Sequence, residues 1–379
     1  MVRQNFELKN NNVYTNNLKV NDLTFEPEIK GMRKKVKLML NGQTIAYLKS
    51  NNIAGTDYMS DYAEVASKKI CDLVGIKCAE TLLANITGIH KSQSEIEQEK
   101  LENEKSEAFL ATLPPSVQEQ ARKHRAEQNL AKAKQPQKGV LSYNYLAEKR
   151  YRDCQVLNVA DLCENFNKIT GRNQPSSANG YMSMLKNLQE NTEFAKSMGI
   201  NENFVLDENL KSDFIKLSMF SYFTGQSDMT KYNIDVVLIN TPQGKKLELA
   251  PLYDNSESFG LSGVESKNDI NQEEIDYVKN SISETINLSD TSKLTIKEQT
   301  PLDITEQAKE LADVIHKDPL AKEIYEKFKN IDIESVVNEL NVDESSFEIV
   351  NFAITELFST RMNNVEKCLD DIKQENFTR

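Results

Sequence analysis

An aspartate, an asparagine and a second aspartate follow an apolar segment in the second half of the chain. Asp228 and Asn233 stand in D-x-x-x-x-N spacing, and a predicted β-hairpin then leads to Asp254. In phosphoryl-transfer enzymes such a set places one carboxylate at the acceptor hydroxyl, while an amide and a second carboxylate hold magnesium on the phosphates. Magnesium prefers oxygen ligands of this kind. D-x-x-x-x-N alone is common, but its place before a hairpin that ends in aspartate favours a phosphoryl-transfer site.

A lysine and a glutamate in the first fifth of the chain could supply the complementary charges. Lys49 closes the strand-like run AYLKS, and Glu64 follows 15 residues later on a predicted helix. Phosphoryl transfer needs a cation on the phosphates and an anion that orients this cation. We therefore expect Lys49 and Glu64 to form an ion pair between a strand and a helix.

A basic turn precedes this strand. It consists of Lys30, Gly31, Arg33, Lys34 and Lys35. Backbone amides and cations in such a turn could cover a triphosphate. The chain has neither a G-x-G-x-x-G nor a Walker A motif, so the assignment rests on the charge and the turn alone.

The elements around these residues predict a small α+β lobe. Two β-prone runs flank the dipeptide Asn41-Gly42, which is a strong hairpin motif, so we expect a hairpin over residues 31–49. Apolar residues then recur at helical spacing as far as Gly75. The runs CAETLLANI and GVLSYNYL indicate two further strands.

A charged stretch at residues 90–137 interrupts these strands, and Pro114-Pro115 divides it into two predicted helices. We interpret it as a solvated insert, with a helix that docks a partner protein as the functional alternative. The domain prediction is therefore an Asn-rich lead or edge strand at residues 1–25, a nucleotide-binding lobe at 26–149 that carries the insert, and a helical catalytic lobe at 150–379.

The helical lobe is predicted from five segments with apolar residues at helical spacing. Between them, the runs IDVVLIN and KKLELAPLYD are joined by TPQG and predict one β-hairpin. The acidic stretch from Asn255 to Thr300 is rich in serine and threonine. We interpret it as a disordered, activation-type segment and as a candidate for self-phosphorylation.

The composition excludes several classes of protein. A length of 379 residues predicts two or three folding units. The formal net charge of -12 argues against a protein that binds the phosphate backbone of nucleic acid. No apolar window is long enough for a membrane span, and the first residues lack the apolar core of a signal peptide.

The 5 cysteines are odd in number and include no CxxC pair, which disfavours both a disulfide framework and a structural zinc site. Cys71 and Cys78 flank a helix end at apolar positions, and we interpret them as core residues. A cytoplasmic location is expected. A translocated effector without a classical signal peptide would show the same features.

The order of these motifs resembles the HipA-like serine/threonine kinases, and most closely their short bacterial members, the CtkA-like kinases, which begin directly with the nucleotide lobe. The resemblance spans roughly residues 26–365, and its most specific parts are Glu64–Ile76, Gly139–Tyr143, Gly225–Asn233 and Leu249–Ser256. It implies a bilobal α+β fold of the protein-kinase type, with a small β-rich N-lobe and a larger, mainly helical C-lobe.

The resemblance also implies a role for each site residue. Asp228 would be the catalytic base, Asn233 and Asp254 the magnesium ligands, Lys49 the phosphate lysine and Glu64 its partner.

Further implications concern the cofactors and the acceptor. A strand from Tyr145 to Lys149, which includes Ala147, would provide backbone hydrogen bonds to adenine. ATP and Mg²⁺ would be the cofactors, and the acceptor would be a serine or threonine hydroxyl of the chain itself or of another protein.

The chain departs from the family pattern in two places. The family often has arginine and histidine around the position after the catalytic aspartate, where this chain has Met229 and Thr230. HipA-like toxins also carry an N-terminal domain that about 25 residues cannot encode, so a HipB-type antitoxin partner and operator binding are not expected. Two alternatives stay open: a phosphoinositide-type lipid kinase, which shares the same motif layout, and a non-catalytic pseudokinase or scaffold.

Overall fold

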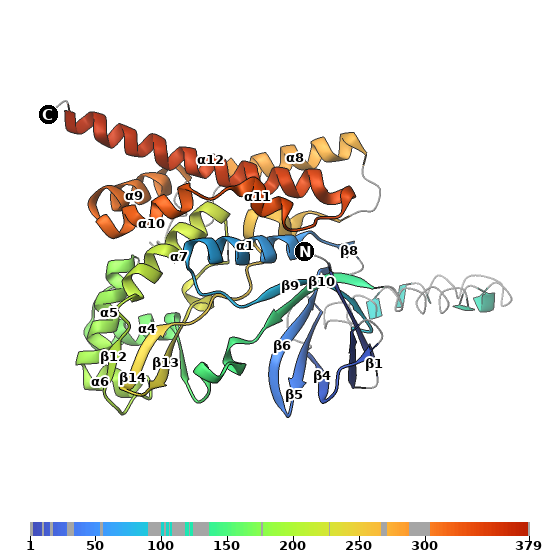
Figure 1. Cartoon of the computed structure of the whole chain (residues 1–379), viewed down its shortest axis with the longest axis horizontal. Coiled ribbons are helices and arrows are strands. Elements are labelled where there is room, and N and C mark those ends of the chain that lie inside the picture. Colours follow the sequence, from blue (N-terminus) through green and yellow to red (C-terminus); the bar gives the residue numbers. More distant parts are fainter. Residues whose placement is uncertain are drawn as a thin grey trace. The chain divides into compact units, whose positions relative to one another are not determined.

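Strands fill the N-terminal part of the chain, and helices form most of the rest (Figure 1). The computed structural model describes residues 3–9, 11–15, 18–28, 34–53, 56–89, 136–175, 177–226, 228–266, 271–287 and 304–377, with isolated positions between 100 and 123. The chain divides into a first unit of Met1–Asp61, Glu80–Ala147 and Glu265–Lys267, and a second unit of Tyr62–Ala79, Glu148–Val264 and Asn268–Arg379. The expected α+β class is confirmed.

The first unit contains an eight-stranded sheet in the order β3-β2-β1-β9-β10-β6-β5-β4. The strands are β1 (Gln4–Lys9), β2 (Asn12–Thr15), β3 (Leu18–Lys19), β4 (Leu23–Glu28), β5 (Lys35–Leu40), β6 (Gln43–Ser50), β9 (Thr81–Thr87) and β10 (Gln137–Tyr143). β1 and β9 are parallel, and the other neighbouring pairs are antiparallel. Two short strands, β7 (Asn52–Ile53) and β8 (Thr56–Asp57), form a separate ribbon.

The described part of residues 1–25 forms strands and not a lead. Phe6, Leu8 and Val13 are buried. In β1 the apolar residues alternate with polar ones, as they do on a strand with one buried face. β1 lies between β2 and β9 and is therefore paired on both sides. The Asn-rich composition concealed this two-residue period in the sequence.

The predicted hairpin and the helix that follows it are present, but almost all of this helix belongs to the second unit. Asn41 and Gly42 connect β5 to β6 with φ values of 51° and 77°, as a two-residue turn with left-handed positions requires. The helix α1 (Ser60–Val74) ends at Gly75, whose φ is 71°. β9 and β10 are direct neighbours although residues 90–137 separate them in sequence. The two helices expected in that insert lie almost wholly outside the described residues, so its role stays a prediction.

The second unit combines helices with a small sheet. Its further helices are α4 (Val159–Thr170), α5 (Ala178–Glu190), α6 (Thr192–Ser197), α7 (Leu210–Thr224), α8 (Gln272–Asn287), α9 (Ile304–Lys317), α10 (Pro319–Lys329), α11 (Ile333–Asn338) and α12 (Glu344–Phe377). The sheet order is β11-β13-β14-β12. β13 (Asp235–Thr241) and β14 (Gly244–Leu249) are the predicted hairpin. β11 (Gln155–Asn158) and β12 (Phe204–Leu206) are too short to show a period in the sequence.

α7 is the core helix of this unit. Its phenylalanines Phe214, Phe220 and Phe223 are at most 1% exposed, and it packs against α5, α10 and α12. It ends at Gly225, where φ is 64° and an added Cβ would lie 2.9 Å from Cδ1 of Leu357 on α12. A glycine is therefore needed at this position, and the polar segment that follows begins at a fixed point.

In the stretch from Asn255 to Thr300, the described residues 255–266 and 271–287 have defined structure, which corrects the expectation of a disordered segment for this part. It contains α8, which packs against α12 through the buried Ile282. Lys279 pairs with Glu348 at 2.5 Å. The polar composition hid the short apolar face of α8. No helix in the described part of the chain is both long and apolar enough to cross a membrane.

Candidate active site

The segment from Asp228 to Asn233 is closed by its own hydrogen bonds. The Asn233 side-chain nitrogen Nδ2 and the Thr230 backbone N–H both donate to the Asp228 carbonyl oxygen, each at 2.8 Å. Thr230 also caps the short 3₁₀ helix Lys231–Asn233, because its hydroxyl accepts from the Tyr232 N–H at 3.3 Å. Since Nδ2 of Asn233 is engaged, its Oδ1 oxygen is the side-chain atom left for a cation.

Gln226 joins this segment to Asp254. Its Nε2 donates to the carbonyl oxygen of Asp254 at 3.2 Å and to Oδ1 of Asn255 at 3.4 Å. Its Oε1 accepts from the Asp228 N–H at 3.4 Å. Gln226 is 1% exposed, so its end of these bonds is shielded from water, although Asp228 and Asp254 are themselves exposed. The structure thereby brings Asp228, Asn233 and Asp254 into one polar cluster.

The sequence analysis gave Gln226 no role. An amide at the first position after the glycine that ends an apolar helix is a signal that could have found it, because a buried amide must have hydrogen-bond partners.

Asp254 has an unusual backbone conformation. Its φ is 59°, in the left-handed region that aspartate tolerates better than most residues. The Ser256 hydroxyl donates to its Oδ1 at 3.4 Å. Both Asp228 and Asp254 are exposed on the surface of the second unit. Their carboxylates are therefore accessible there, while their backbones are fixed from within by Gln226.

Hydrogen bonds to Asp235, the first residue of β13, hold the start of this strand beside the cluster. The Tyr253 hydroxyl donates to Oδ2 of Asp235 at 3.1 Å, and Asn158 donates to Oδ1 of the same carboxylate at 2.9 Å. Burial and the neighbouring Asp235 charge raise the pKa of Tyr253, so its hydroxyl stays protonated and can donate. Asn158 also donates to the Tyr232 carbonyl at 2.8 Å. The N-cap of α4 thus anchors the loop that carries Asn233.

Two residues that depart from the family pattern have structural roles. Met229 is 3% exposed and packs inside the unit, and Thr230 caps the 3₁₀ helix. Lys231 is also buried, and its Nζ donates to Oε1 of Gln174 at 2.6 Å. These side chains build the loop.

In the first unit, three of the predicted phosphate-binding lysines lie at the same end of β5 and β6. Lys35 and Lys49 are directly opposite each other on these antiparallel strands. Side chains at opposed positions share one face of the sheet, and like charges there raise the local potential. Lys34 is 5% exposed and donates from Nζ to Asn52 at 3.2 Å and to Gln137 at 3.3 Å. This end of the sheet is therefore suited to an anionic group.

The strand that carries Lys49 is fixed by a close approach of β10. Gly139 pairs with Ser50, and a Cβ added to Gly139 would lie 2.1 Å from the carbonyl oxygen of Lys49. Lys49 is 6% exposed, so its side chain is largely buried in the protein.

The strand expected at Tyr145–Lys149 is absent from these described residues. Tyr145–Ala147 is a 3₁₀ turn, and a second 3₁₀ turn begins at Lys149. Asn144 causes this turn, because its Oδ1 accepts from the Leu146 N–H at 3.2 Å and its carbonyl accepts from the Ala147 N–H at 2.9 Å. The donors of Leu146 and Ala147 are thus already bonded within the chain, which corrects the expectation that a strand here presents them to adenine.

The remaining predicted residues are placed as follows. Glu64 lies on α1 in the second unit and is 3% exposed. Lys49 belongs to the first unit, and the ion pair between the two stays a prediction. Lys30, Gly31 and Arg33 lie outside the described residues.

The donor set fits magnesium that is bound together with phosphate. Oδ1 of Asn233 and the carboxylate of Asp254 are hard oxygen ligands. Among the described residues, no group of three or more His, Cys, Asp or Glu side chains is arranged to hold a metal by itself. Magnesium usually takes one or two protein carboxylates and completes its shell with water and substrate phosphates, so a sparse set is the expected one.

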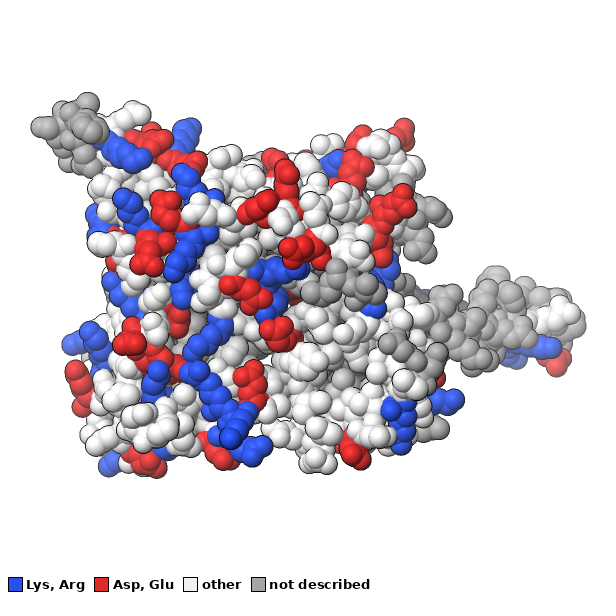
Figure 2. All heavy atoms as spheres, in the orientation of Figure 1, with Lys and Arg blue, Asp and Glu red and all other residues white. Residues whose placement is uncertain are grey.

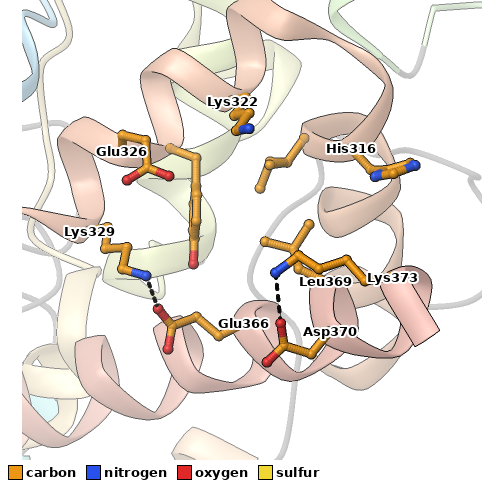
Figure 3. A pocket seen from close by; sticks show the side chains of 10 residues that line it. His316, Lys322, Glu326, Lys329, Glu366, Leu369, Asp370 and Lys373 are labelled. Atoms are coloured by element: carbon orange, nitrogen blue, oxygen red, sulfur yellow. Dashed lines mark hydrogen bonds and ion pairs between the residues drawn. The ribbon is translucent and has the colours of Figure 1, made fainter. Parts of the chain in front are cut away.

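A separate cavity of about 450 Å³ lies among α9, α10 and α12 of the second unit (Figure 3). It is lined by ion pairs such as Lys329–Glu366 at 2.7 Å and Lys373–Asp370 at 2.8 Å. It contains none of the predicted site residues. On the face drawn in Figure 2, acidic and basic side chains are interspersed over the helices of this unit, with no broad patch of one sign.

No family model and no curated protein matches the sequence. Solved structures do match. The proinflammatory kinase CtkA of Helicobacter pylori is 11% identical with a TM-score of 0.47, over 91% of this chain and 96% of that one. HipA, from the HipA–HipB–operator DNA complex of Shewanella oneidensis MR-1, is 13% identical with a TM-score of 0.42, over 90% of this chain and 67% of that one. The chain is thus similar to two HipA-like kinases, the group that its motifs resemble.

Proposed function

We propose that the chain is an ATP- and Mg²⁺-dependent protein kinase that transfers a phosphoryl group to a serine or threonine hydroxyl, of itself or of another protein. One observation carries the proposal. A single buried amide, Gln226, is bonded to the backbone of both Asp228 and Asp254, and Asn233 is bonded to Asp228. The three residues selected for their chemistry therefore form one cluster whose geometry is set from inside the fold.

Each residue of the cluster has a distinct task in this proposal. The Asp228 carboxylate accepts a hydrogen bond from the acceptor hydroxyl, orients it and takes its proton. Oδ1 of Asn233 and the Asp254 carboxylate would hold Mg²⁺, which would supply positive charge that offsets the negative charge of the phosphates. Because the loop is already closed by hydrogen bonds, little ordering is left to occur when the substrate binds.

The first unit would bind the nucleotide. The proposal assigns Lys49, Lys34 and Lys35 to the phosphates, because they lie at one end of β5 and β6. In the proposal, Glu64 orients Lys49. The turn with Lys30, Gly31 and Arg33 covers the triphosphate.

Adenine would lie at the 3₁₀ turn that contains Tyr145 and Ala147. Since the Ala147 N–H is already bonded to Asn144, the proposal assigns the Ala147 carbonyl oxygen to the base.

The test is transfer of labelled phosphate from ATP. Full-length protein is incubated with Mg²⁺ and γ-labelled ATP, alone and with a general protein acceptor. Asp228→Ala is expected to lower the rate at least about 100-fold, the lower range for loss of a general base. Asp371→Ala, at an exposed position on α12, is the matched control and should keep the wild-type rate. Equal rates for Asp228→Ala and wild type would refute the proposal.

Two further arms separate the alternatives. Phosphoinositide vesicles replace the protein acceptor, and label in lipid alone would make the chain a lipid kinase. A Mg²⁺-dependent thermal shift with ATP, without transfer to any acceptor, would make it a pseudokinase. Label on serine or threonine of a protein, identified by mass spectrometry, supports the proposal.

A further inference from the structure

A charged side chain on α12 is completely buried. Arg361 is 0% exposed, and it is the largest of the fully buried side chains in the described part of the chain. Burial lowers the pKa of its guanidinium to about 10, which leaves the group charged at neutral pH. A charge inside a protein is costly unless it is hydrogen-bonded or paired. The position of Arg361 therefore needs a reason beyond packing.

The guanidinium of Arg361 reaches the last turn of α7. Its Nη1 donates to the Tyr222 carbonyl oxygen at 2.7 Å, and its central carbon lies 5.3 Å from the centroid of the Tyr222 ring. The carbonyl groups at the C-terminal end of a helix carry partial negative charge, which a cation stabilises. The face of an aromatic ring attracts a cation as well. Arg361 thus contacts Tyr222 at both the backbone and the side chain.

α12 meets this end of α7 at a second point. A Cβ added to Gly225 would lie 2.9 Å from Cδ1 of Leu357, which precedes Arg361 by one turn of α12. The Tyr222 carbonyl that accepts from Arg361 also accepts from the Gly225 N–H, at 3.3 Å. α12 therefore holds both the glycine that ends α7 and the carbonyl to which this glycine is bonded.

The end of α7 leads directly into the polar cluster. The Gln226 N–H donates to the Ser221 carbonyl at 3.1 Å, and the Ser221 hydroxyl donates to the Gln226 carbonyl at 3.3 Å. The Gln226 side chain then bonds to the backbones of Asp228 and Asp254. The place of the last turn of α7 therefore decides where the Gln226 side chain begins.

We propose that Arg361 is a positioning residue for the candidate active site: it holds the last turn of α7 and thereby sets the position of Gln226, which bonds both aspartates. The inference rests on the proposed function, because it assigns Arg361 to the placement of Asp228 and Asp254. In this role Arg361 acts through Gln226 and not on the substrate itself.

A role in stability alone makes a different prediction. Replacement of a buried charge by a well-packed apolar side chain often leaves stability unchanged or raises it. Arg361→Met is such a replacement, because methionine is unbranched and adapts to irregular space. The Tyr222 carbonyl keeps its bond from Gly225 in this variant. We expect Arg361→Met to unfold at about the same urea concentration as wild type, but to lose the fixed position of Gln226.

The first test is independent of activity. Full-length wild type and Arg361→Met are compared by hydrogen exchange with peptide mass spectrometry. We expect the peptide that spans residues 221–230 to exchange roughly 2- to 30-fold faster in the variant, the range of couplings that packed contacts carry. Peptides from the hairpin of β13 and β14 should exchange as in wild type.

The second test measures phosphate transfer over a Mg²⁺ titration. Arg361→Met should raise the Mg²⁺ concentration for half-maximal rate by roughly 2- to 30-fold, because Asp254 is no longer held in place through Gln226. Arg361→Lys keeps a cation that can donate to the Tyr222 carbonyl, and it should restore part of this loss. A contribution to stability alone would not change the Mg²⁺ requirement of the folded protein.

Gln155→Met is the matched control. Nε2 of Gln155 donates to the Met198 carbonyl at 2.7 Å, at the end of α6, so this variant also loses a bond to a carbonyl at a helix end. Its exchange in residues 221–230 and its Mg²⁺ requirement should equal those of wild type. If Arg361→Met does not fold, the neutral and shorter Arg361→Gln replaces it under the same criteria.

The two tests together decide the proposal. Wild-type exchange and a wild-type Mg²⁺ requirement in the folded Arg361→Met variant would overturn it. Faster exchange with an unchanged Mg²⁺ requirement would also overturn it, because the end of α7 would then move without an effect on the site. If no preparation transfers phosphate and residues 221–230 still exchange faster, the proposed function fails and the anchoring of Gln226 by Arg361 stands.

Discussion

The side-chain amide of Asn233 donates a 2.8 Å hydrogen bond to the carbonyl oxygen of Asp228. This bond fixes the orientation of the amide, because Nδ2 is held by the protein and Oδ1 faces away from that bond. Asn233, which was selected as a metal ligand, thus also closes the loop that carries the proposed base, Asp228. The two roles can be separated by substitution.

Asn233→Ala removes both the hydrogen bond and the oxygen ligand, whereas Asn233→Asp keeps an oxygen ligand and loses the donor. We expect Asn233→Ala to lower phosphate transfer at least about 100-fold, as expected when a group that stabilises transition-state charge is lost. It should also raise the Mg²⁺ concentration for half-maximal rate. Asn233→Asp should transfer at an intermediate rate. Rates measured over a Mg²⁺ titration check both expectations.

Asn165→Ala is the matched control, because Asn165 also donates to a backbone carbonyl, that of Asp161, at 2.9 Å on α4. Its Mg²⁺ dependence should equal that of wild type. A Mg²⁺ dependence that Asn233→Ala leaves unchanged would contradict the assignment of Asn233 as a metal ligand.

Gln226→Ala should weaken both the fold and the cluster. It removes the hydrogen bonds to the Asp228 N–H and to the Asp254 carbonyl, and at about 0.5–1.5 kcal/mol for each bond the loss costs about 1–3 kcal/mol. We expect a decrease of that size in the free energy of unfolding, measured with urea, and a higher Mg²⁺ requirement for transfer. Gln226→Glu keeps the acceptor for the Asp228 N–H but adds a buried charge, so this variant should be no more stable than Gln226→Ala.

Gln189→Ala separates stability from function. Gln189 also donates to a backbone carbonyl in the second unit, that of Phe204, at 2.8 Å. Gln189→Ala should lower the free energy of unfolding without a change in the Mg²⁺ concentration that transfer requires. If Gln226→Ala behaves in the same way, Gln226 only supports the fold and does not position the aspartates.

Gly139→Ala should disturb the strand that carries Lys49. The added methyl group would lie 2.1 Å from the Lys49 carbonyl oxygen, and backbone atoms on both sides must move. Overpacking of this kind costs about 1–3 kcal/mol or more. We expect a lower melting temperature and weaker ATP binding by calorimetry. Gly263→Ala has open space around its Cβ and is the control. Unchanged ATP affinity in a folded Gly139→Ala variant would argue against a nucleotide site beside Lys49.

The parts of the fold that the sequence predicted were those with a local cause. Asn41 and Gly42 specify the β5–β6 turn by their own backbone preferences, and Gly75 ends α1 in the same way. The spacing of Asp228 and Asn233 was informative because the hydrogen bond between them spans one short loop.

The parts that the sequence did not predict depend on distant partners. β1 lies inside the sheet because β9 pairs with it, and no residue in the Asn-rich start of the chain indicates this. Gln226 acquires its role from Asp254, 28 residues later. The turn at Tyr145 follows from the side chain of Asn144, which competes with strand pairing for the backbone donors.

Asp207 should make stability depend on pH in the acid range. Its side chain is 5% exposed, and burial alone would raise its pKa. Hydrogen bonds from Lys246 at 2.6 Å and from the Asn209 N–H at 2.8 Å outweigh burial and hold the pKa of Asp207 below its ordinary value.

Because the folded pKa is lower than the unfolded one, the unfolded chain takes up the proton first as the pH falls. The contribution of Asp207 is therefore complete above the unfolded pKa and is lost as the pH falls through that value toward the folded pKa. Between about pH 5 and pH 3, Asp207→Asn should lose less unfolding free energy than wild type, as should Lys246→Met, which removes the partner. Urea unfolding at each pH measures these slopes. If the free energy of unfolding of Asp207→Asn falls with pH as steeply as that of wild type, other carboxylates determine the loss of stability at acid pH.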